Sequence, residues 1–304
     1  MPKRMKQSGS LRMIVLMILF SSFVFPIIAE PPVWWQEVHD YDANKPWYSY
    51  YKYTTSYFGP NALPVPEIAD GLIADRHSAE ISTDIFWGYG DRTQSLSTRL
   101  TYAFIPGRLA ISGWGVLAEH YNVTTEVRDL RASMDKDTKG SLIIGDLYFS
   151  TIIGLFREKK IMPDLSLEVV LKTAASGNPN NSRYVDTPGY YFDVNAGKSI
   201  FFKHSYFKEL RLVGMAGFLC YQLNSHHQND APLFGGKVML KARKWAWENS
   251  ISGYSGWTGL GDKPLVLRSR LKLDADNFCT FIQYQHSLRD YPFRRLQTGV
   301  AFKF

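Results

Sequence analysis

The sequence is poor in cysteine and in long apolar runs. Only two cysteines, Cys220 and Cys279, occur among its 304 residues, too few for the disulfide scaffold of an exported protein. They fall near opposite ends of two predicted strands, too far apart to be bridged, so we expect no disulfide. Beyond residue 29, no stretch approaches the roughly 20 apolar residues of a spanning helix. If the chain crosses a membrane, it must do so with strands.

Motifs for nucleotide and metal chemistry are also missing. The sequence has no Walker-type or dinucleotide glycine loop and no zinc motif. The pair His286-Ser287 would place its side chains on opposite faces of a strand, where they cannot share a hydrolytic site. The pair His226-His227, with Asp230 nearby, lies in a polar loop that has no fixed ligand geometry and no Cys or Glu cluster, so we predict no metal site. We therefore expect no catalytic residues, no cofactor and no enzyme activity.

The start of the chain has the layout of an export signal. Four basic residues precede an apolar run over residues 13–29, which predicts a secretory signal peptide over 1–29. A retained membrane anchor is the alternative, but the run is short and Pro26 interrupts it. Residues 1–29 hold four basic residues and no acidic one, so without them the formal charge falls from +7 to +3. That balance gives little support for nucleic-acid binding, and we expect none.

From residue 78 onward, apolar and polar residues alternate in long segments. In the last one, 293–304, Leu296, Thr298 and Val300 alternate with polar or small residues, and the chain stops on Phe304. A period of two predicts a β-strand with one apolar face. We expect twelve strands: 78–90, 93–105, 108–121, 141–156, 164–176, 189–199, 209–224, 233–243, 245–257, 264–274, 278–288 and 293–304.

These strands are long enough to cross a bilayer at a tilt, and short turns alternate with longer loops, as in outer-membrane barrels. Strand 264–274 aligns three cationic side chains on one face, which a dry core would not accommodate without partners. We predict an all-β, transmembrane antiparallel up-and-down β-barrel of about 12 strands over 78–304, in the cell outer membrane. Ten or fourteen strands remain possible, and a secreted soluble glycan-binding β-protein is the alternative.

Residues 30–77 are rich in aromatics and proline. Pro60, Pro64 and Pro66 exclude a helix and a central strand, while the Trp and Tyr content is too high for a typical disordered linker. We expect an extension that is packed either inside the barrel as a plug or against its periplasmic rim.

The polar strand faces supply the candidate functional residues. The predicted lumen-lining residues are Glu80, Asp84, Arg99, Glu168, Lys172, Lys237, Lys241, Arg268, Arg270, Lys272 and Arg295. Cations outnumber carboxylates in this set, which favours anionic solutes; the alternative is that the charges pair and only stabilise the barrel. Aromatic residues at strand ends are expected at the two membrane interfaces: Trp87, Tyr89, Tyr102, Phe104, Trp245, Trp247, Phe302 and Phe304. The same register puts Tyr221 on the outer face, and Cys220 and Cys279 on the polar face.

Two segments resemble known barrels. The closing strand resembles that of Gram-negative outer-membrane barrels, in which a C-terminal Phe is part of the assembly signal, and this implies the barrel-assembly machinery as a partner. The stretch GDLYFSTIIGLFREKKIMPDLSLEVVLKTAASG, residues 145–177, is similar to a pattern in twelve-stranded barrels of the phenol-degradation MetA-pathway type. That likeness covers about a tenth of the chain and implies a transport-like role.

We therefore expect outer-membrane lipid as a partner and a passive channel or transporter for small solutes that the sequence does not name. A structural or partner-binding barrel without transport is the alternative.

Overall fold

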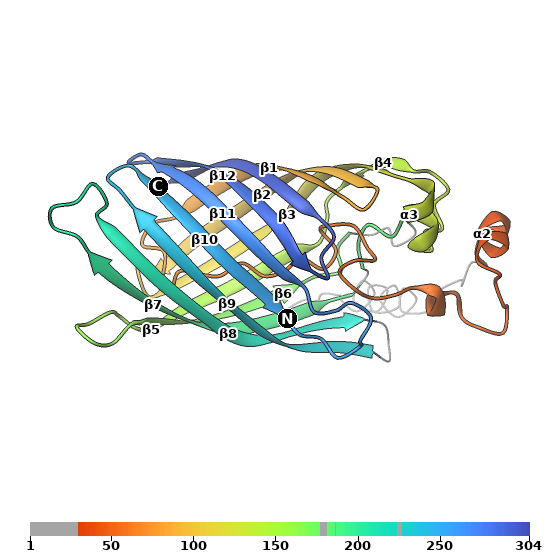
Figure 1. Cartoon of the computed structure of the whole chain (residues 1–304), viewed down its shortest axis with the longest axis horizontal. Coiled ribbons are helices and arrows are strands. Elements are labelled where there is room, and N and C mark those ends of the chain that lie inside the picture. Colours follow the sequence, from red (N-terminus) through yellow and green to blue (C-terminus); the bar gives the residue numbers. More distant parts are fainter. Residues whose placement is uncertain (1–29, 177–180, 186, 224–226) are drawn as a thin grey trace, which may run out of the picture.

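The computed structural model describes residues 30–176, 181–185, 187–223 and 227–304; the predicted signal peptide lies outside them. One antiparallel sheet closes on itself (Figure 1), because its first strand, β1 (Ser78–Gly88), pairs with its last, β13 (Arg294–Lys303). The strands between them are β2 (Asp91–Ile105), β3 (Leu109–Val123), β4 (Lys139–Ile143), β5 (Leu147–Phe156), β6 (Asp164–Lys172), β7 (Gly189–Phe201), β8 (Glu209–Leu223), β9 (His227–Lys241), β10 (Trp245–Tyr254), β11 (Leu265–Asp274) and β12 (Phe278–Arg289).

Strands β4 and β5 occupy a single position in the barrel, because both pair with β3. The chain breaks between them at Ile144, whose φ is +65°, while the Gly145 amide still donates to the Val116 carbonyl at 2.8 Å. The break faces a bulge of β3, where the β2–β3 register shifts between Leu96 and Ser97. The thirteen strands therefore form a barrel of twelve staves, which confirms the predicted fold class. The sequence predicts the same stave as one unbroken strand, 141–156.

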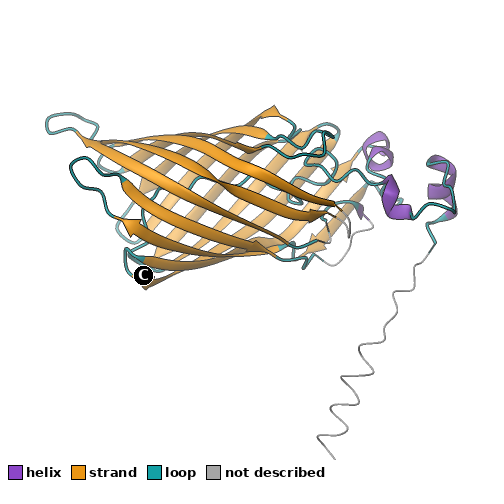
Figure 2. Cartoon of the chain, turned by 90° about the horizontal axis from the view of Figure 1, so that it is seen from below, coloured by secondary structure: helices purple, strands orange, loops and turns teal. Residues whose placement is uncertain are grey.

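The two ends of the barrel differ (Figures 1 and 2). Short connections and the C-terminus lie at one end, which we call the C-terminal end. The other, the loop end, has the 124–138 loop with helix α3 (Thr125–Leu130), whose first turn is capped by the Thr124 hydroxyl accepting from the Val127 amide at 3.3 Å. Helix α2 (Val33–Val38) and the 3-10 turn η1 (Trp47–Tyr50) lie beyond the same end. Since outer-membrane barrels have short periplasmic turns and longer external loops, we expect the loop end to be the external one.

The outer face of the strands is apolar. Its side chains are exposed, as Leu100 is at 59%, and such a surface around a whole sheet would aggregate in water but suits the hydrocarbon of a bilayer. No helix in the described part of the chain is long and apolar enough to cross a membrane. Apolar residues on this face include Ile81, Ile85, Ile111, Phe149, Ile153, Val169, Leu171, Phe192, Val194, Leu212, Val238, Ile251, Leu267, Leu271 and Ile282.

Strand β8 corrects one part of the predicted register. Tyr221 is 1% exposed, and its hydroxyl donates to the Pro64 carbonyl at 3.0 Å inside the barrel. Cys220 must then face outward, next to Tyr190 on the paired strand, whereas Cys279 does face the interior beside buried Phe281. The prediction was wrong because apolar side chains on β8 face both ways: Leu219 and Tyr221 pack inward against the N-terminal segment. As expected, the two cysteines form no disulfide.

Candidate functional site

The interior of the barrel holds a cavity of about 590 Å³. Its wall is polar, because every second residue of each strand faces inward and most of those residues are charged, hydroxylated or amidic. Nine of the eleven predicted lumen-lining residues border this cavity: Glu80, Asp84, Arg99, Glu168, Lys237, Arg268, Arg270, Lys272 and Arg295.

The other two predicted residues lie at the rims. Lys172 is buried at the loop end, where its ammonium lies 2.6 Å from the Asp146 carboxylate. Lys241 is exposed at the C-terminal end of the barrel, as the last residue of β9. Neither side chain borders the cavity.

Residues 59–74, which we call the lumen segment, pass through the barrel. At the loop end, the Gly59 amide donates to the Ser182 carbonyl at 3.1 Å, and the Tyr291 hydroxyl donates to the Pro60 carbonyl at 2.9 Å. At the C-terminal end, the Gly107 amide donates to the Ala74 carbonyl at 3.0 Å. The chain thus runs the length of the interior before it turns into β1.

Prolines explain how the barrel wall grips the lumen segment. They keep it extended and unable to join the sheet, so its carbonyl groups remain available to inward side chains. Arg268 donates to the Val65 carbonyl at 2.6 Å, and the Ser252 hydroxyl donates to the Pro66 carbonyl at 2.9 Å. Apolar residues of the segment, such as Leu63, belong to the buried cluster inside the barrel. The segment is therefore fixed by both hydrogen bonds and packing.

One carboxylate of the lumen segment, that of Glu67, meets three arginines of the wall. Glu67 lies 3.5 Å from Arg270, 3.5 Å from Arg295 and 3.9 Å from Arg268, and it accepts a hydrogen bond from Gln283 at 3.2 Å.

Three further carboxylates pair with cations of the same wall. Asp70 lies 2.6 Å from the Lys237 ammonium. On the wall itself, Glu248 pairs with Lys272 at 2.5 Å and Asp84 with Arg295 at 2.7 Å. Five cations of the wall thus have carboxylate partners, and two of these carboxylates, Glu67 and Asp70, belong to residues that precede the barrel. The sixth cation, Arg99, lies over the Trp114 ring.

The charge around the cavity is consequently close to balanced, and the excess of cations predicted from the sequence is absent. Of the acidic residues at the cavity, Glu67 and Asp70 come from the lumen segment and the others from the wall. Six basic side chains border the cavity, Arg99, Lys237, Arg268, Arg270, Lys272 and Arg295, and seven acidic ones, Glu67, Asp70, Glu80, Asp84, Asp146, Glu168 and Glu248. Without the two carboxylates of the segment, the basic residues would be in excess.

A second ionic cluster lies at the loop end, and it was not predicted from the sequence. Arg183, fully buried, donates to Glu119 at 2.8 Å and to Asp91 at 2.6 Å; Arg131 also reaches Asp91 at 2.6 Å. Asn61 of the lumen segment donates to Glu119 at 2.7 Å. Arg131 and Arg183 come from loops, where spacing carries no information about partners. The cluster ties two loops and the lumen segment to β2 and β3.

The aromatic N-terminal residues pack beyond this cluster. The Trp35 indole donates to the Ala132 carbonyl at 2.9 Å, which fastens α2 to the loop that follows α3. Tyr51, Tyr53, Tyr57 and Phe58 stack edge to face or tilted against one another. Burial raises the pKa of Tyr51 and Tyr53 to about 12, so both remain neutral phenols.

The predicted interface aromatics lie on the outer face at strand ends. Trp87 and Tyr89 are near the loop end, and the other six are at the C-terminal end. Two of the indoles there have polar partners: Trp245 donates to the Tyr206 hydroxyl at 3.0 Å and Trp247 to the Ser269 hydroxyl at 2.9 Å. The exposed aromatics of this end include Tyr102, Phe104, Phe302 and Phe304. Their contact with bilayer interfaces remains a prediction.

The described residues contain no group of three or more His, Cys, Asp or Glu side chains placed to hold a metal ion. His286 lies on the outer face, where its Nδ1 is 3.5 Å from the Tyr284 hydroxyl oxygen. Of the His226-His227 pair, His226 lies outside the described residues.

No family model matches this chain, and no curated protein matches it in sequence. Solved barrels do match its structure. The COG4313 outer membrane channel from Pseudomonas putida F1 aligns with a TM-score of 0.50 at 12% identity, covering 80% of this chain and 100% of that one. This chain has the fold of an outer-membrane β-barrel. The likeness includes the NanC porin, with a TM-score of 0.48 at 8% identity over 74% of this chain and 100% of that one. The KdgM porin aligns with a TM-score of 0.44 at 7% identity, covering 74% of this chain and 99% of that one.

Proposed function

We propose that this protein is a small-solute channel of the outer membrane whose pore is closed by its own lumen segment. The observation that supports the proposal best is the contact between Glu67 and three arginines of the wall, at 3.5 to 3.9 Å. A barrel that served only as a scaffold would have no need for a cationic wall neutralised by a segment that is separate from the strands. The polar interior also suits the passage of water-soluble molecules.

The same contacts give the channel a charge preference in its open form. When the lumen segment leaves, Glu67 and Asp70 leave with it, and the remaining cavity wall has more basic than acidic side chains. The excess is concentrated on β11, where Arg268, Arg270 and Lys272 face the lumen in succession. Rings of cationic side chains favour anions. We therefore propose small anionic solutes as the preferred cargo.

Planar-bilayer recordings on two deletion variants test this function. Deleting residues 30–77 removes the lumen segment, whereas deleting 30–53 removes only the part beyond the loop end and is the matched control. We expect stepwise conductance from the 30–77 deletion, with a reversal potential in a salt gradient that favours chloride, and little conductance from the control or the full chain. Heat-modifiable gel mobility checks that all three barrels are folded.

Silent bilayers with the folded 30–77 deletion would exclude a channel and leave the structural or partner-binding barrel. Equal conductance from both deletions would instead show that the lumen segment does not close the pore. A cation-favouring reversal potential would overturn only the proposed cargo class.

A further inference from the structure

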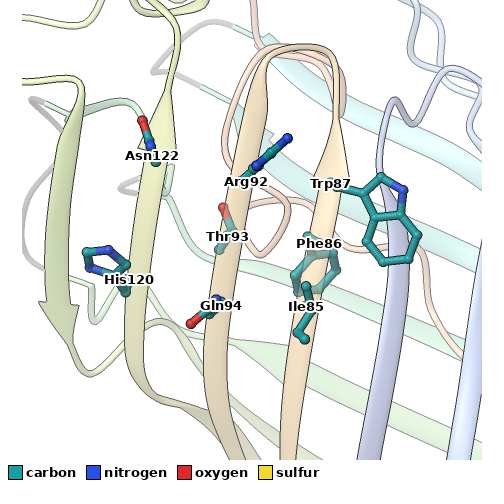
Figure 3. A pocket seen from close by; sticks show the side chains of 8 residues that line it. All are labelled: Ile85, Phe86, Trp87, Arg92, Thr93, Gln94, His120 and Asn122. Carbon is teal, nitrogen blue, oxygen red and sulfur yellow. The ribbon is translucent and has the colours of Figure 1, made fainter.

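A second cavity, of about 520 Å³, lies on the outside of the barrel near the loop end (Figure 3). Trp87 and Ile85 of β1, Arg92 and Gln94 of β2, and the end of β3 line it. The residues from β3 are His120 and Asn122. These side chains face outward, because their neighbours Phe86, Thr93 and Tyr121 are buried in the interior. Phe86 and Thr93 also border this cavity from the inward side, but its exposed side chains face away from the lumen.

The strand register extends this site into a row of cations. Trp87 is paired with Arg294 on one side and Arg92 on the other, and Arg92 is paired with Asn122, which is paired with Lys139. Five outward side chains thus form one rung across β13, β1, β2, β3 and β4. We call Arg294, Arg92 and Lys139 the outer basic row. Neighbouring strands are about 4.8 Å apart, so successive cations of the row are on the order of 10 Å apart.

The outer basic row has no counter-charge within the described part of the protein. All three side chains are exposed, and none takes part in an ion pair or side-chain hydrogen bond with a described residue. The acidic residues of these strands face inward, as Asp84 and Glu119 do. This contrasts with the interior, where five of the six cations that border the cavity have carboxylate partners. Unpaired cations on the lipid-facing side of a barrel point to an anionic partner outside the chain.

The height of the row identifies that partner. On β13, Arg294 and Phe302 are eight residues apart on the same face, which is about 27 Å along the strand and about 20 Å along the barrel axis at a tilt near 40°. The apolar band of outer-membrane barrels is about 25 Å tall and bounded by aromatic girdles. With Phe302 at one boundary, Arg294 lies near the other edge of this band, from where a long basic side chain reaches the lipid headgroups. Below it, Ile85 and Leu296 form the next rung, at the height of acyl chains.

We propose that the outer basic row and the adjoining groove bind the anionic, phosphate-bearing headgroup of a lipid in the outer leaflet. Arg92 and Arg294, on either side of Trp87, supply charge-assisted donors for phosphate. Gln94 and Asn122 supply amide donors for other headgroup oxygens. The Ile85 rung takes the start of an acyl chain. Binding there fixes the rotational position of the barrel in the leaflet through β1–β4, the staves next to the closing seam.

The experiment uses the full chain in detergent micelles and counts retained lipid by native mass spectrometry. The probes are short-chain phosphatidylglycerol, which is anionic, and phosphatidylcholine, which is zwitterionic; inorganic phosphate is added as a competitor. The test variant is Arg92→Gln/Lys139→Gln/Arg294→Gln. The control, Lys45→Gln/Lys52→Gln/Lys136→Gln, removes the same charge from exposed positions outside the strands. Heat-modifiable mobility verifies folding.

We expect the parent and the control to retain phosphatidylglycerol in preference to phosphatidylcholine. The single variant Arg92→Gln should lose about fivefold in affinity and the triple variant about a hundredfold, because each surface cation contributes a similar increment to anionic-lipid binding. Arg92→Lys/Arg294→Lys should retain the preference. If the triple variant fails to fold, the fivefold loss of phosphatidylglycerol affinity expected for Arg92→Gln tests the proposal by itself.

Two outcomes overturn the proposal. One is an equal loss in the control variant, since the effect would then follow net charge and not this site. The other is complete displacement of the bound phosphatidylglycerol by millimolar inorganic phosphate, since the site would then bind a free anion and not a lipid. Neither outcome bears on whether the lumen conducts.

Discussion

The grip of the wall on the lumen segment can be tested at a single carboxylate. Glu67→Gln removes the negative charge that faces Arg268, Arg270 and Arg295 and keeps the size of the side chain. At 3.5 Å, each of the pairs with Arg270 and Arg295 would interact by about 5 kcal/mol at an effective dielectric of 20. The Glu67 side chain is 39% exposed, so solvent screening and desolvation cancel most of this. A net loss of about 2 kcal/mol remains, in the range of one charge-assisted hydrogen bond.

A loss of that size lowers the ratio of closed to open channels about thirtyfold, since every 1.4 kcal/mol is a factor of ten. Single-channel recording in planar bilayers measures the ratio directly. Glu80→Gln is the matched control, because Glu80 faces the same cavity but belongs to β1 and forms no ion pair with a described residue. The idea fails if the two variants open equally often, because lumen charge and not the grip on the segment would then set the open fraction.

Three further outcomes are expected. Tyr221→Phe removes the hydrogen bond to the Pro64 carbonyl, worth about 1 kcal/mol, and should raise the open fraction about fivefold in the same recordings, with Tyr284→Phe on the outer face unchanged. Arg183→Leu leaves two buried carboxylates short of their partner and should destabilise the barrel by about 3–5 kcal/mol, seen as unfolding at lower urea; an unchanged midpoint would contradict this. Deleting Phe304 should reduce the amount of barrel assembled in cells while leaving detergent refolding intact, and equal losses in both would argue for a purely structural role.

The alternation of the strands was enough to predict the barrel, and the reason is physical. A strand between lipid and a polar lumen needs an apolar face and a polar face. The sequence of β11 therefore identifies both faces, with leucines outside and Arg268, Arg270 and Lys272 inside. The prediction was wrong where both faces are apolar. On β8, Leu219 and Tyr221 pack against the lumen segment. The sequence of β8 alone does not indicate that an apolar segment lies inside the barrel, so the inward face of the strand could not be identified.

The ionic partners of the buried charges could not be predicted from the sequence, for a related reason. The cationic wall was predicted, but its neutralisation by Glu67 and Asp70 requires knowing the path of a proline-rich segment without periodicity. The loop-end cluster around Arg183 joins residues that are 64 and 92 positions apart. Strand register fixes neighbours across a sheet, whereas a loop residue finds its partner only in three dimensions.

The direction in which the lumen segment runs decides on which side of the outer membrane residues 30–53 lie. The lumen segment enters at the loop end and leaves at the C-terminal end before β1 begins. With the loop end outside, as we expect, residues 30–53 lie on the external side, where Trp35 fastens them to the loop after α3. An epitope inserted next to Lys45, which is exposed, should therefore be reached by antibodies on intact cells. If the loop end is external, this stretch must also cross the membrane during assembly, either before β1 pairs with β13 or through the closed barrel.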